Sequence, residues 1–203
     1  YHIASLREKR AGSIEMAGNI AVLRETNSGK HLQTNHYLHP KMVNKYLHIN
    51  RSVDMDSYAR FNRMNEMAES YRGNFTPQSA VAVLSDHTDP FSGKVQGTGN
   101  TLAANTTVSS LVVSANERRI YVARGSQTPV SQSEYVSFPF PEDFDPSTFE
   151  SSEPATLQPP DWTQGRPELN EALYTFIQAK EKHEIALDDA ASYRLLQEVV
   201  AKD

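Results

Sequence analysis

The stretch HLQTNHYLHP, residues 31–40, holds three of the chain's seven histidines around one asparagine, Asn35. Pro40 has no backbone N–H for a sheet ladder, so it ends any strand that precedes it. The stretch therefore predicts a strand over residues 31–38. The carboxamide of Asn35 carries two N–H donors and no net charge, and donors of this kind stabilise the oxyanion of acyl transfer. From residue types alone, however, a turn-capping role for Asn35 is the stronger interpretation.

The histidines of this stretch raise a metal site as an alternative. Alternate side chains of a strand point to opposite faces, so His31 and His39 face one way and His36 the other. One strand therefore does not bring the three imidazoles to one ion. The chain also has no cysteine and no HExxH pairing, which are patterns typical of zinc sites. We expect no metal ligands here and keep a histidine–metal hydrolase as a minor alternative.

The overall composition is that of a globular chain, with 203 residues, 38% hydrophobic and 22% charged. The formal net charge of −5 argues against a nucleic-acid partner, because phosphate binding needs clustered Lys and Arg. No apolar run has the length of a membrane span, and no signal-like segment is visible. We therefore expect a soluble, cytoplasmic chain without a membrane partner. The absence of cysteine excludes disulfides and thiol chemistry within the chain.

Hydrophobic periodicity predicts strands and amphipathic helices in one α+β body. Residues 58–71 repeat large apolar side chains at steps of three and four, which is the spacing of one helix face. Thr76 and Pro77 form the N-cap and first turn of a further helix. The expected strands are residues 1–5, 13–24, 31–38, 106–114 and 118–124, with hairpin turns at 27–29 and 115–117. The expected helices are residues 54–73, 76–84, 167–185 and 188–200.

The distribution of proline divides the chain into three parts. Residues 138–160 hold six of the eleven prolines, which is typical of an extended linker. We therefore predict an α+β domain over residues 1–137, a proline-rich linker over 138–166 and a helical hairpin over 167–203. The two helices of the hairpin are too short to be stable alone, so they should pack as an antiparallel pair.

Four short motifs occur in one order along the chain. They are Thr34-Asn35-His36, Ser57-Tyr-Ala-Arg60-Phe61, Leu84-Ser-Asp86-His87 and Thr106-Thr107-Val108-Ser109-Ser110, and the segment Tyr121 to Val130 follows them. In this order and spacing the chain resembles the N-terminal-nucleophile (Ntn) hydrolase family of penicillin acyltransferases and choloylglycine hydrolases, from about Ser13 to Val136. The resemblance implies part of an αββα sandwich with antiparallel sheets.

The resemblance also implies roles for individual residues. Asn35 contributes to the oxyanion hole, and Arg60 orients and ionises the nucleophile, as a permanently charged guanidinium does well. A surface arginine paired with Asp56 or Glu66 is the competing interpretation of Arg60.

The remaining site candidates follow from the same motifs. His36, Thr107 and Ser109 are candidates for contact with the substrate, and Asp86 and His87 for positions behind the site. Simple β-propensity is the competing explanation of Thr107 and Ser109. The family chemistry requires neither a metal nor an organic cofactor, and the expected substrates are a small-molecule amide or an acyl-coenzyme A.

One departure from the family pattern matters for function. The family nucleophile is an N-terminal cysteine exposed by self-cleavage, and this chain has no cysteine. We expect the chain to be the C-terminal part of a processed acyltransferase or amidohydrolase, acting on amide or thioester bonds through an acyl-enzyme. Its partner is then a nucleophile-bearing N-terminal chain or segment of the same protein. Two alternatives remain, namely Ser13 as a nucleophile after cleavage at Gly12–Ser13, and a catalytically inactive binding module.

Overall fold

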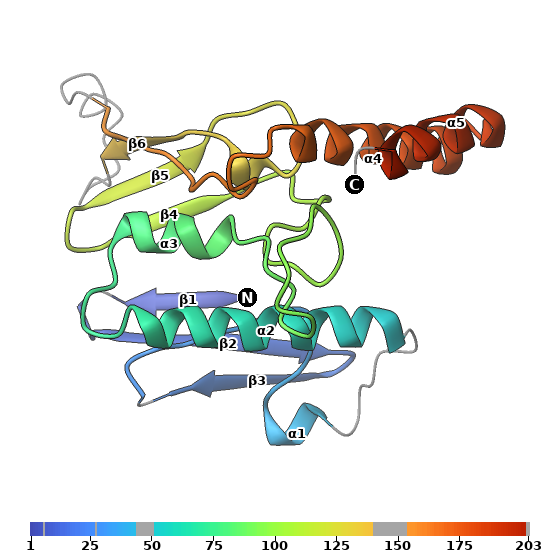
Figure 1. Ribbon diagram of the computed structural model, residues 1–203. Helices are drawn as coiled ribbons and strands as arrows, with labels where there is room; N and C mark the ends of the chain where they lie inside the picture. Colours follow the sequence, from blue (N-terminus) through green and yellow to red (C-terminus); the bar gives the residue numbers. More distant parts are fainter. Residues whose placement is uncertain (6, 27, 44–50, 140–153, 202–203) are drawn as a thin grey trace.

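The computed structural model describes residues 1–5, 7–26, 28–43, 51–139 and 154–201. Within these ranges the chain has an α+β fold with two antiparallel sheets and a C-terminal helical pair (Figure 1), which confirms the predicted fold class. The strands are β1 (His2–Ser5), β2 (Arg10–Ala17), β3 (Ile20–Glu25), β4 (Leu111–Ser114), β5 (Arg119–Ala123), β6 (Tyr135–Pro139) and β7 (Thr156–Leu157). The helices are α1 (Pro40–Val43), α2 (Arg51–Ser70), α3 (Pro77–Leu84), α4 (Glu168–Glu184) and α5 (Asp189–Val200), with a 3-10 helix at Val130–Gln132.

The first sheet has the strand order β1-β2-β3 and corrects one prediction. The single strand expected over residues 13–24 is two strands, because Gly18 and Asn19 turn the chain between β2 and β3. Gly18 has a φ of +55°, a left-handed conformation that glycine adopts without a Cβ clash. The expected turn at residues 27–29 is not a hairpin between strands, because no strand follows it over residues 30–39. Residue 27 itself lies outside the described residues.

The second sheet has the order β4-β5-β6-β7. Val112 of β4 pairs with Tyr121 of β5 around the turn expected at residues 115–117. The strand predicted over residues 106–114 is shorter, because residues 106–110 form a loop before β4. One face of this sheet packs on α3, and the buried cluster at that contact consists of Val81, Val112, Tyr121 and Tyr135.

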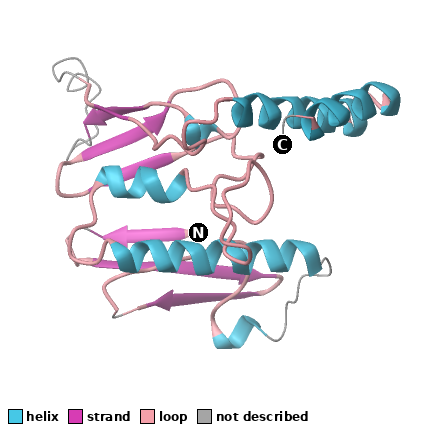
Figure 2. Cartoon of the chain, in the orientation of Figure 1, coloured by secondary structure: helices cyan, strands magenta, loops and turns pink. Residues whose placement is uncertain are grey.

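Helices α2 and α3 lie side by side in front of the strands (Figure 2). α3 begins as the sequence predicts, since Thr76 Oγ1 accepts a hydrogen bond from Ser79 N at 3.1 Å and Pro77 lies in the first turn. The opposite faces of the sheets have no covering layer within the described ranges, and several large apolar side chains are exposed there. These are Ile3, Met16 and Leu23 on the first sheet and Leu111, Val113, Val122 and Phe138 on the second.

The predicted linker over residues 138–166 lies partly outside the described residues, which exclude 140–153. Its described part is packed against the body. β7 pairs with β6, and the ring of Trp162 stacks on that of His87 at a centroid distance of 4.1 Å. Beyond it, α4 and α5 form the predicted antiparallel pair and extend away from the sheets (Figure 1).

The contact of α3 with the second sheet makes the first testable prediction. Val81 is fully buried in the cluster, so Val81→Ala leaves a cavity and should lower the free energy of unfolding by about 2 kcal/mol. Val108→Ala is the matched control, because Val108 is 80% exposed and its truncation should change stability by less than about 0.5 kcal/mol. Urea unfolding of both variants measures the difference. Equal midpoints would show that α3 does not depend on this cluster.

Candidate active site

Asn35 lies on an irregular loop, residues 30–39, and not on the predicted strand over residues 31–38. The loop runs between the first sheet and α2. On the α2 side, Thr34 Oγ1 donates to the carbonyl oxygen of Ser57 at 2.9 Å, and the Ser57 hydroxyl is 2.8 Å from His36 Nδ1. Thr34 and His36, on either side of Asn35, therefore both bind α2, and these hydrogen bonds hold the loop in the absence of a strand ladder.

On the sheet side, the loop is held by the carboxylate of Glu15 in β2. Glu15 is only 4% exposed, and its Oε2 accepts hydrogen bonds from the backbone N–H groups of Leu38 and His39, each at 3.0 Å. Its Oε1 accepts from Arg24 Nε at 2.8 Å. Burial acts to raise the pKa of Glu15, but the bonds from His39, Arg24 and Leu38 outweigh it and leave the pKa below the usual value.

Arg24 continues this network into the residues next to Asn35. Its Nη2 donates to the Leu32 carbonyl oxygen at 2.7 Å and to Gln33 Oε1 at 2.6 Å. Gln33 Nε2 in turn donates to the carbonyl oxygen of Thr34 at 2.9 Å. The backbone that carries Asn35 is therefore fixed from both sides by charged and amide groups.

The side chain of Asn35 is oriented by Arg60 of α2. Arg60 Nη2 donates to Asn35 Oδ1 at 2.9 Å, and Arg60 Nε and Nη2 donate to Asp56 Oδ2 at 3.0 and 2.8 Å. Asp56 was the competing partner expected for Arg60, and both contacts are present. Asn35 is exposed, and its amide nitrogen donates no hydrogen bond to another described residue. Among the described residues, the side-chain oxygen of Asn35 thus has a partner and its side-chain nitrogen has none.

His36, a candidate for substrate contact, is buried beneath this pair. It is 6% exposed, and its ring lies 3.9 Å from the Tyr58 ring and 5.6 Å from the Phe61 ring between centroids. Burial lowers the pKa of His36. Its Nε2 has no hydrogen-bond partner among the described residues. In this structure His36 attaches the loop to α2 through its contacts with Ser57 and Tyr58. Its contact with a substrate stays a prediction.

Asp86 and His87 lie behind the same helix. Arg63, one turn after Arg60, donates to both carboxylate oxygens of Asp86, each at 2.9 Å; this pairing raises the pKa of Arg63. Arg63 also pairs with Glu66 at 2.9 Å. His87 is 2% exposed and its Nδ1 lies 2.8 Å from the Gln96 carbonyl oxygen. Asp86 therefore fixes the loop after α3 against α2, whereas His87 holds the loop to itself through Gln96.

Thr107 and Ser109 are not brought to Asn35 by any contact among the described residues. Both belong to the loop before β4, where Thr107 is half-buried and Ser109 is exposed. Thr107 is fixed through its backbone, whose N–H donates to Ala104 and whose carbonyl accepts from Val130, each at 2.9 Å. Their role in substrate binding stays a prediction.

Two sets of contacts at the site are not predicted from the sequence, although Ser13 itself is considered there as an alternative nucleophile. Ser13 is fully buried in β2, where its hydroxyl lies 2.7 Å from His31 Nε2 and 3.2 Å from His2 Nδ1. The Glu15–Arg24 pair is the second. Strand alternation places Ser13 and Glu15 on the same face of β2, and this was the signal that could have placed both under the loop.

The described ranges also bear on metal binding and on membrane insertion. No group of three His, Asp or Glu residues there is placed to hold a metal ion. No described helix combines the length and apolar character needed to cross a membrane.

The Glu15 network predicts a pH-dependent stability. A carboxyl whose pKa is lowered by folding stabilises the fold above its unfolded pKa, and this contribution is lost as the pH falls through the folded pKa. Glu15→Gln should therefore lower the free energy of unfolding by about 3 kcal/mol at pH 7. The difference from the parent chain should shrink as the pH falls below 4.5, the ordinary value for this carboxyl.

Urea unfolding between pH 3 and pH 7 measures this effect. Glu25→Gln is the control, because the Arg10–Glu25 pair is solvent-exposed and such pairs contribute less than about 1 kcal/mol. A Glu15→Gln loss that does not change with pH would refute the ionised role of Glu15.

Comparison with protein families gives one match. The family model described as acyl-coenzyme A:6-aminopenicillanic acid acyl-transferase matches residues 1–128, well over half of the 203 residues. The match includes the loop of Asn35, α2 with Arg60, and Asp86. Comparison with curated proteins found no match, and comparison with solved structures found none. The chain therefore belongs to the acyl-coenzyme A:6-aminopenicillanic acid acyl-transferase family, an Ntn-type family of acyltransferases and hydrolases.

Proposed function

We propose that this chain contributes the oxyanion-binding and positioning groups of an acyltransferase or amidohydrolase that acts on an amide or thioester carbonyl. The observation that carries the proposal is the Asn35–Arg60 contact of 2.9 Å. Because Arg60 holds the exposed carboxamide by its oxygen, the proposal orients the N–H groups of Asn35 toward the substrate carbonyl. This is the orientation that an oxyanion requires.

The nucleophile in this proposal lies outside the 203 residues, because the chain has no cysteine. It is carried by an N-terminal chain or segment of the same protein and exposed by autoproteolytic processing, with its own α-amine as the base. Ser13 is less suited to this role, since it is fully buried and paired with neighbours on both sides within the first sheet.

The proposed reaction has two steps, acylation of the nucleophile and deacylation. The nucleophile forms a bond to the carbonyl carbon, and the carbonyl π electrons move to the oxygen, where Asn35 donates a hydrogen bond. Collapse of this intermediate expels the protonated amine or thiol and leaves the acyl-enzyme. Water or an acceptor amine then loses a proton to the α-amine and bonds to the acyl carbon; the bond from the acyl carbon to the nucleophile breaks, the nucleophile regains the proton, and the acid or new amide leaves. The steps require no metal or organic cofactor, and an acyl-coenzyme A is a suitable acyl donor.

Arg60 supplies the permanent charge of the site. Asp56 accepts two hydrogen bonds from Arg60, which keeps the guanidinium in one orientation, and the Arg60 side chain remains 18% exposed. A cation fixed beside a nucleophile favours its ionised form. In the proposal, Arg60 therefore orients Asn35 and lowers the pKa of the nucleophile at the same time.

The direct test is Asn35→Ala in the protein assembled with its nucleophile-bearing segment. Loss of one oxyanion donor should lower kcat about 100- to 1000-fold with little change in KM. Asn74→Ala is the control, because Asn74 is exposed within the α2–α3 connection, residues 71–76. Acyl-enzyme formation is followed by mass spectrometry on an amide and thioester substrate panel. If Asn35→Ala forms the acyl-enzyme at the parental rate, the oxyanion role is wrong.

Arg60→Gln tests the electrostatic role separately. Removing the charge should raise the pKa of the nucleophile, so the acidic limb of the pH–rate profile should move up by about one pH unit. Arg72→Gln is the matched control, because Arg72 lies just beyond the same helix with its side chain 62% exposed. An unshifted profile in Arg60→Gln would leave Arg60 with a positioning role only. An assembled protein that forms no acyl-enzyme with any substrate would favour the binding-module alternative.

A further inference from the structure

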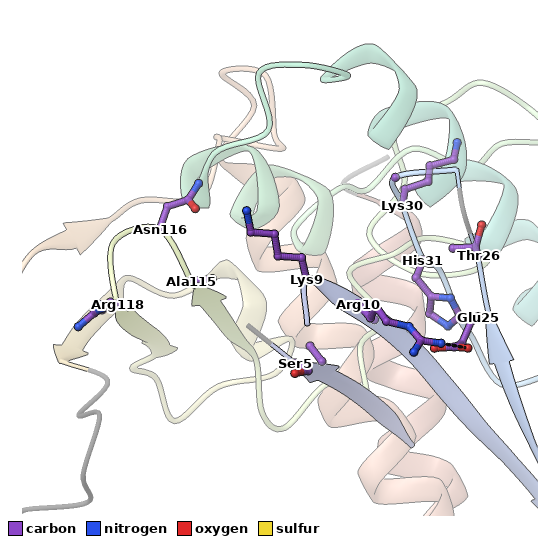
Figure 3. A pocket seen from close by; sticks show the side chains of 13 residues that line it. Ser5, Lys9, Arg10, Glu25, Thr26, Lys30, His31, Ala115, Asn116 and Arg118 are labelled. Carbon is purple, nitrogen blue, oxygen red and sulfur yellow. Dashed lines mark hydrogen bonds and ion pairs between the residues drawn. The ribbon is translucent and has the colours of Figure 1, made fainter. Parts of the chain in front are cut away.

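In the described part of the chain, three histidines have a buried ring nitrogen without a hydrogen-bond partner, namely His31 Nδ1, His36 Nε2 and His87 Nε2. His31 lines a cavity of about 920 Å³ (Figure 3), and its other nitrogen lies 2.7 Å from the Ser13 hydroxyl. The second nitrogen of His36 likewise lies beside a hydroxyl, that of Ser57. A hydroxyl both donates and accepts, so neither contact fixes which ring nitrogen carries the proton.

His87 differs from the other two, because its contact fixes the tautomer. Its Nδ1 lies 2.8 Å from the backbone carbonyl oxygen of Gln96, and a carbonyl oxygen only accepts. Nδ1 therefore carries a proton, and Nε2 of the neutral ring is an acceptor with no donor. When this ring takes up a second proton, the proton binds Nε2.

The ring of His87 is covered by the C-terminal segment. It stacks on the ring of Trp162 with 4.1 Å between centroids and 20° between the ring planes, and His87 is 2% exposed. Gly97 of the same loop lies so close that an added Cβ would meet the indole at 3.4 Å and Leu173 of α4 at 3.5 Å. Trp162 Nε1 donates to Asn170 Oδ1 of α4 at 2.9 Å. The ring pair therefore connects the loop after α3 to α4.

The carboxylates around His87 are engaged elsewhere. The titratable side chains of the elements packed around it are Arg63 and Tyr71 of α2, Asp86 and Asp89 of its own loop, and Asp161 of the C-terminal segment. Each carboxylate already accepts a hydrogen bond from another side chain, Asp86 from Arg63, Asp89 from Gln96 and Asp161 from Thr163. None of these groups is hydrogen-bonded to Nε2.

A proton on Nε2 would therefore place a charged N–H in a buried position without an acceptor, which is unfavourable. Burial lowers the pKa of His87 more than the Gln96 bond and the charge of Asp86 raise it. The attraction of an imidazolium to the face of an indole acts in the opposite direction, but it supplies no acceptor for Nε2–H. Because docking lowers this pKa, docking is strongest above the ordinary value of 6.5 and weakens as the pH falls below it.

We propose that His87 is a proton-sensitive contact that holds the C-terminal segment, residues 161–173, on the loop after α3. The segment is docked while Nε2 is unprotonated. Proton uptake at Nε2 separates the indole from the imidazole and frees α4 and α5 from the body. This inference goes beyond the acyl-transfer function and does not depend on the chemistry of Asn35.

NMR on the 203-residue chain between pH 8 and pH 5 tests the proposal. The nitrogen chemical shifts of the imidazole report the protonation of His87, and hydrogen exchange of the single indole N–H reports docking. The protection of the Trp162 indole, corrected for the intrinsic effect of pH on exchange, should fall about threefold or more over this range. This fall should coincide with the titration of His87. Far-ultraviolet circular dichroism should stay constant, because the helices remain folded.

Two histidine variants complete the test. His87→Asn keeps an N–H donor for Gln96 but takes up no proton, so the indole protection should no longer depend on pH. His183→Asn is the matched control, because the side chain of His183 is 66% exposed and pairs with Asp189 at the junction of α4 and α5. It should keep the parental response.

Four results would overturn the proposal. Two concern the variants, namely a pH response that persists in His87→Asn or one that is lost in His183→Asn. The other two concern the parent chain, namely a His87 that stays neutral down to pH 5, or one that becomes protonated while the indole protection holds or rises. The parent measurements decide the matter even if His87→Asn does not fold.

Discussion

The buried carboxylate of Glu15 is the interaction on which the site geometry depends. It joins a strand of the first sheet to the loop of Asn35 through the N–H groups of Leu38 and His39 and through Arg24. A buried charge is tolerated only when its hydrogen-bonding capacity is satisfied, and here the partners are the groups that need a fixed place. The loop forms no strand ladder, so the hydrogen bonds to Glu15 hold its backbone in place as strand pairing would.

The orientation of the Asn35 side chain follows from a short series of hydrogen bonds. Asp56 orients Arg60, and Arg60 binds the side-chain oxygen of Asn35, which is itself exposed. Each group is held by the one before it, so the Asn35 carboxamide has a defined contact without being buried. In the proposed oxyanion role, an exposed carboxamide without such support would rotate freely and would stabilise a developing negative charge less well. Membership of an acyltransferase family gives this arrangement a chemical context.

The sequence predicted the parts of the fold that depend on local pattern. The cap at Thr76, the periodic helix α2 and the hairpin around residues 115–117 follow from residue types that act over a few positions. The loop of residues 31–38 was wrongly predicted as a strand. Its backbone groups form hydrogen bonds with the side chains of Glu15 and Arg24 in place of a neighbouring strand. A hydrogen bond from a side chain to a remote backbone leaves no periodic trace.

The site shows the same division. The family motifs named Asn35 and Arg60, and the structure brings these two together. The motif residue His36 is buried instead, because Tyr58 and Phe61 pack over its ring. The alternation of Ser13 and Glu15 along β2 was visible in the sequence, but its meaning depends on what covers that face, and only the fold shows this.

The stack of Trp162 on His87 has a practical consequence. The chain has a single tryptophan, and its indole touches the body through His87 and α4 through a 2.9 Å bond from Nε1 to Asn170 Oδ1. Its emission is therefore an intrinsic optical reporter of whether the C-terminal segment is docked. Burial lowers the pKa of His87, so the ring that stacks on Trp162 favours its neutral form.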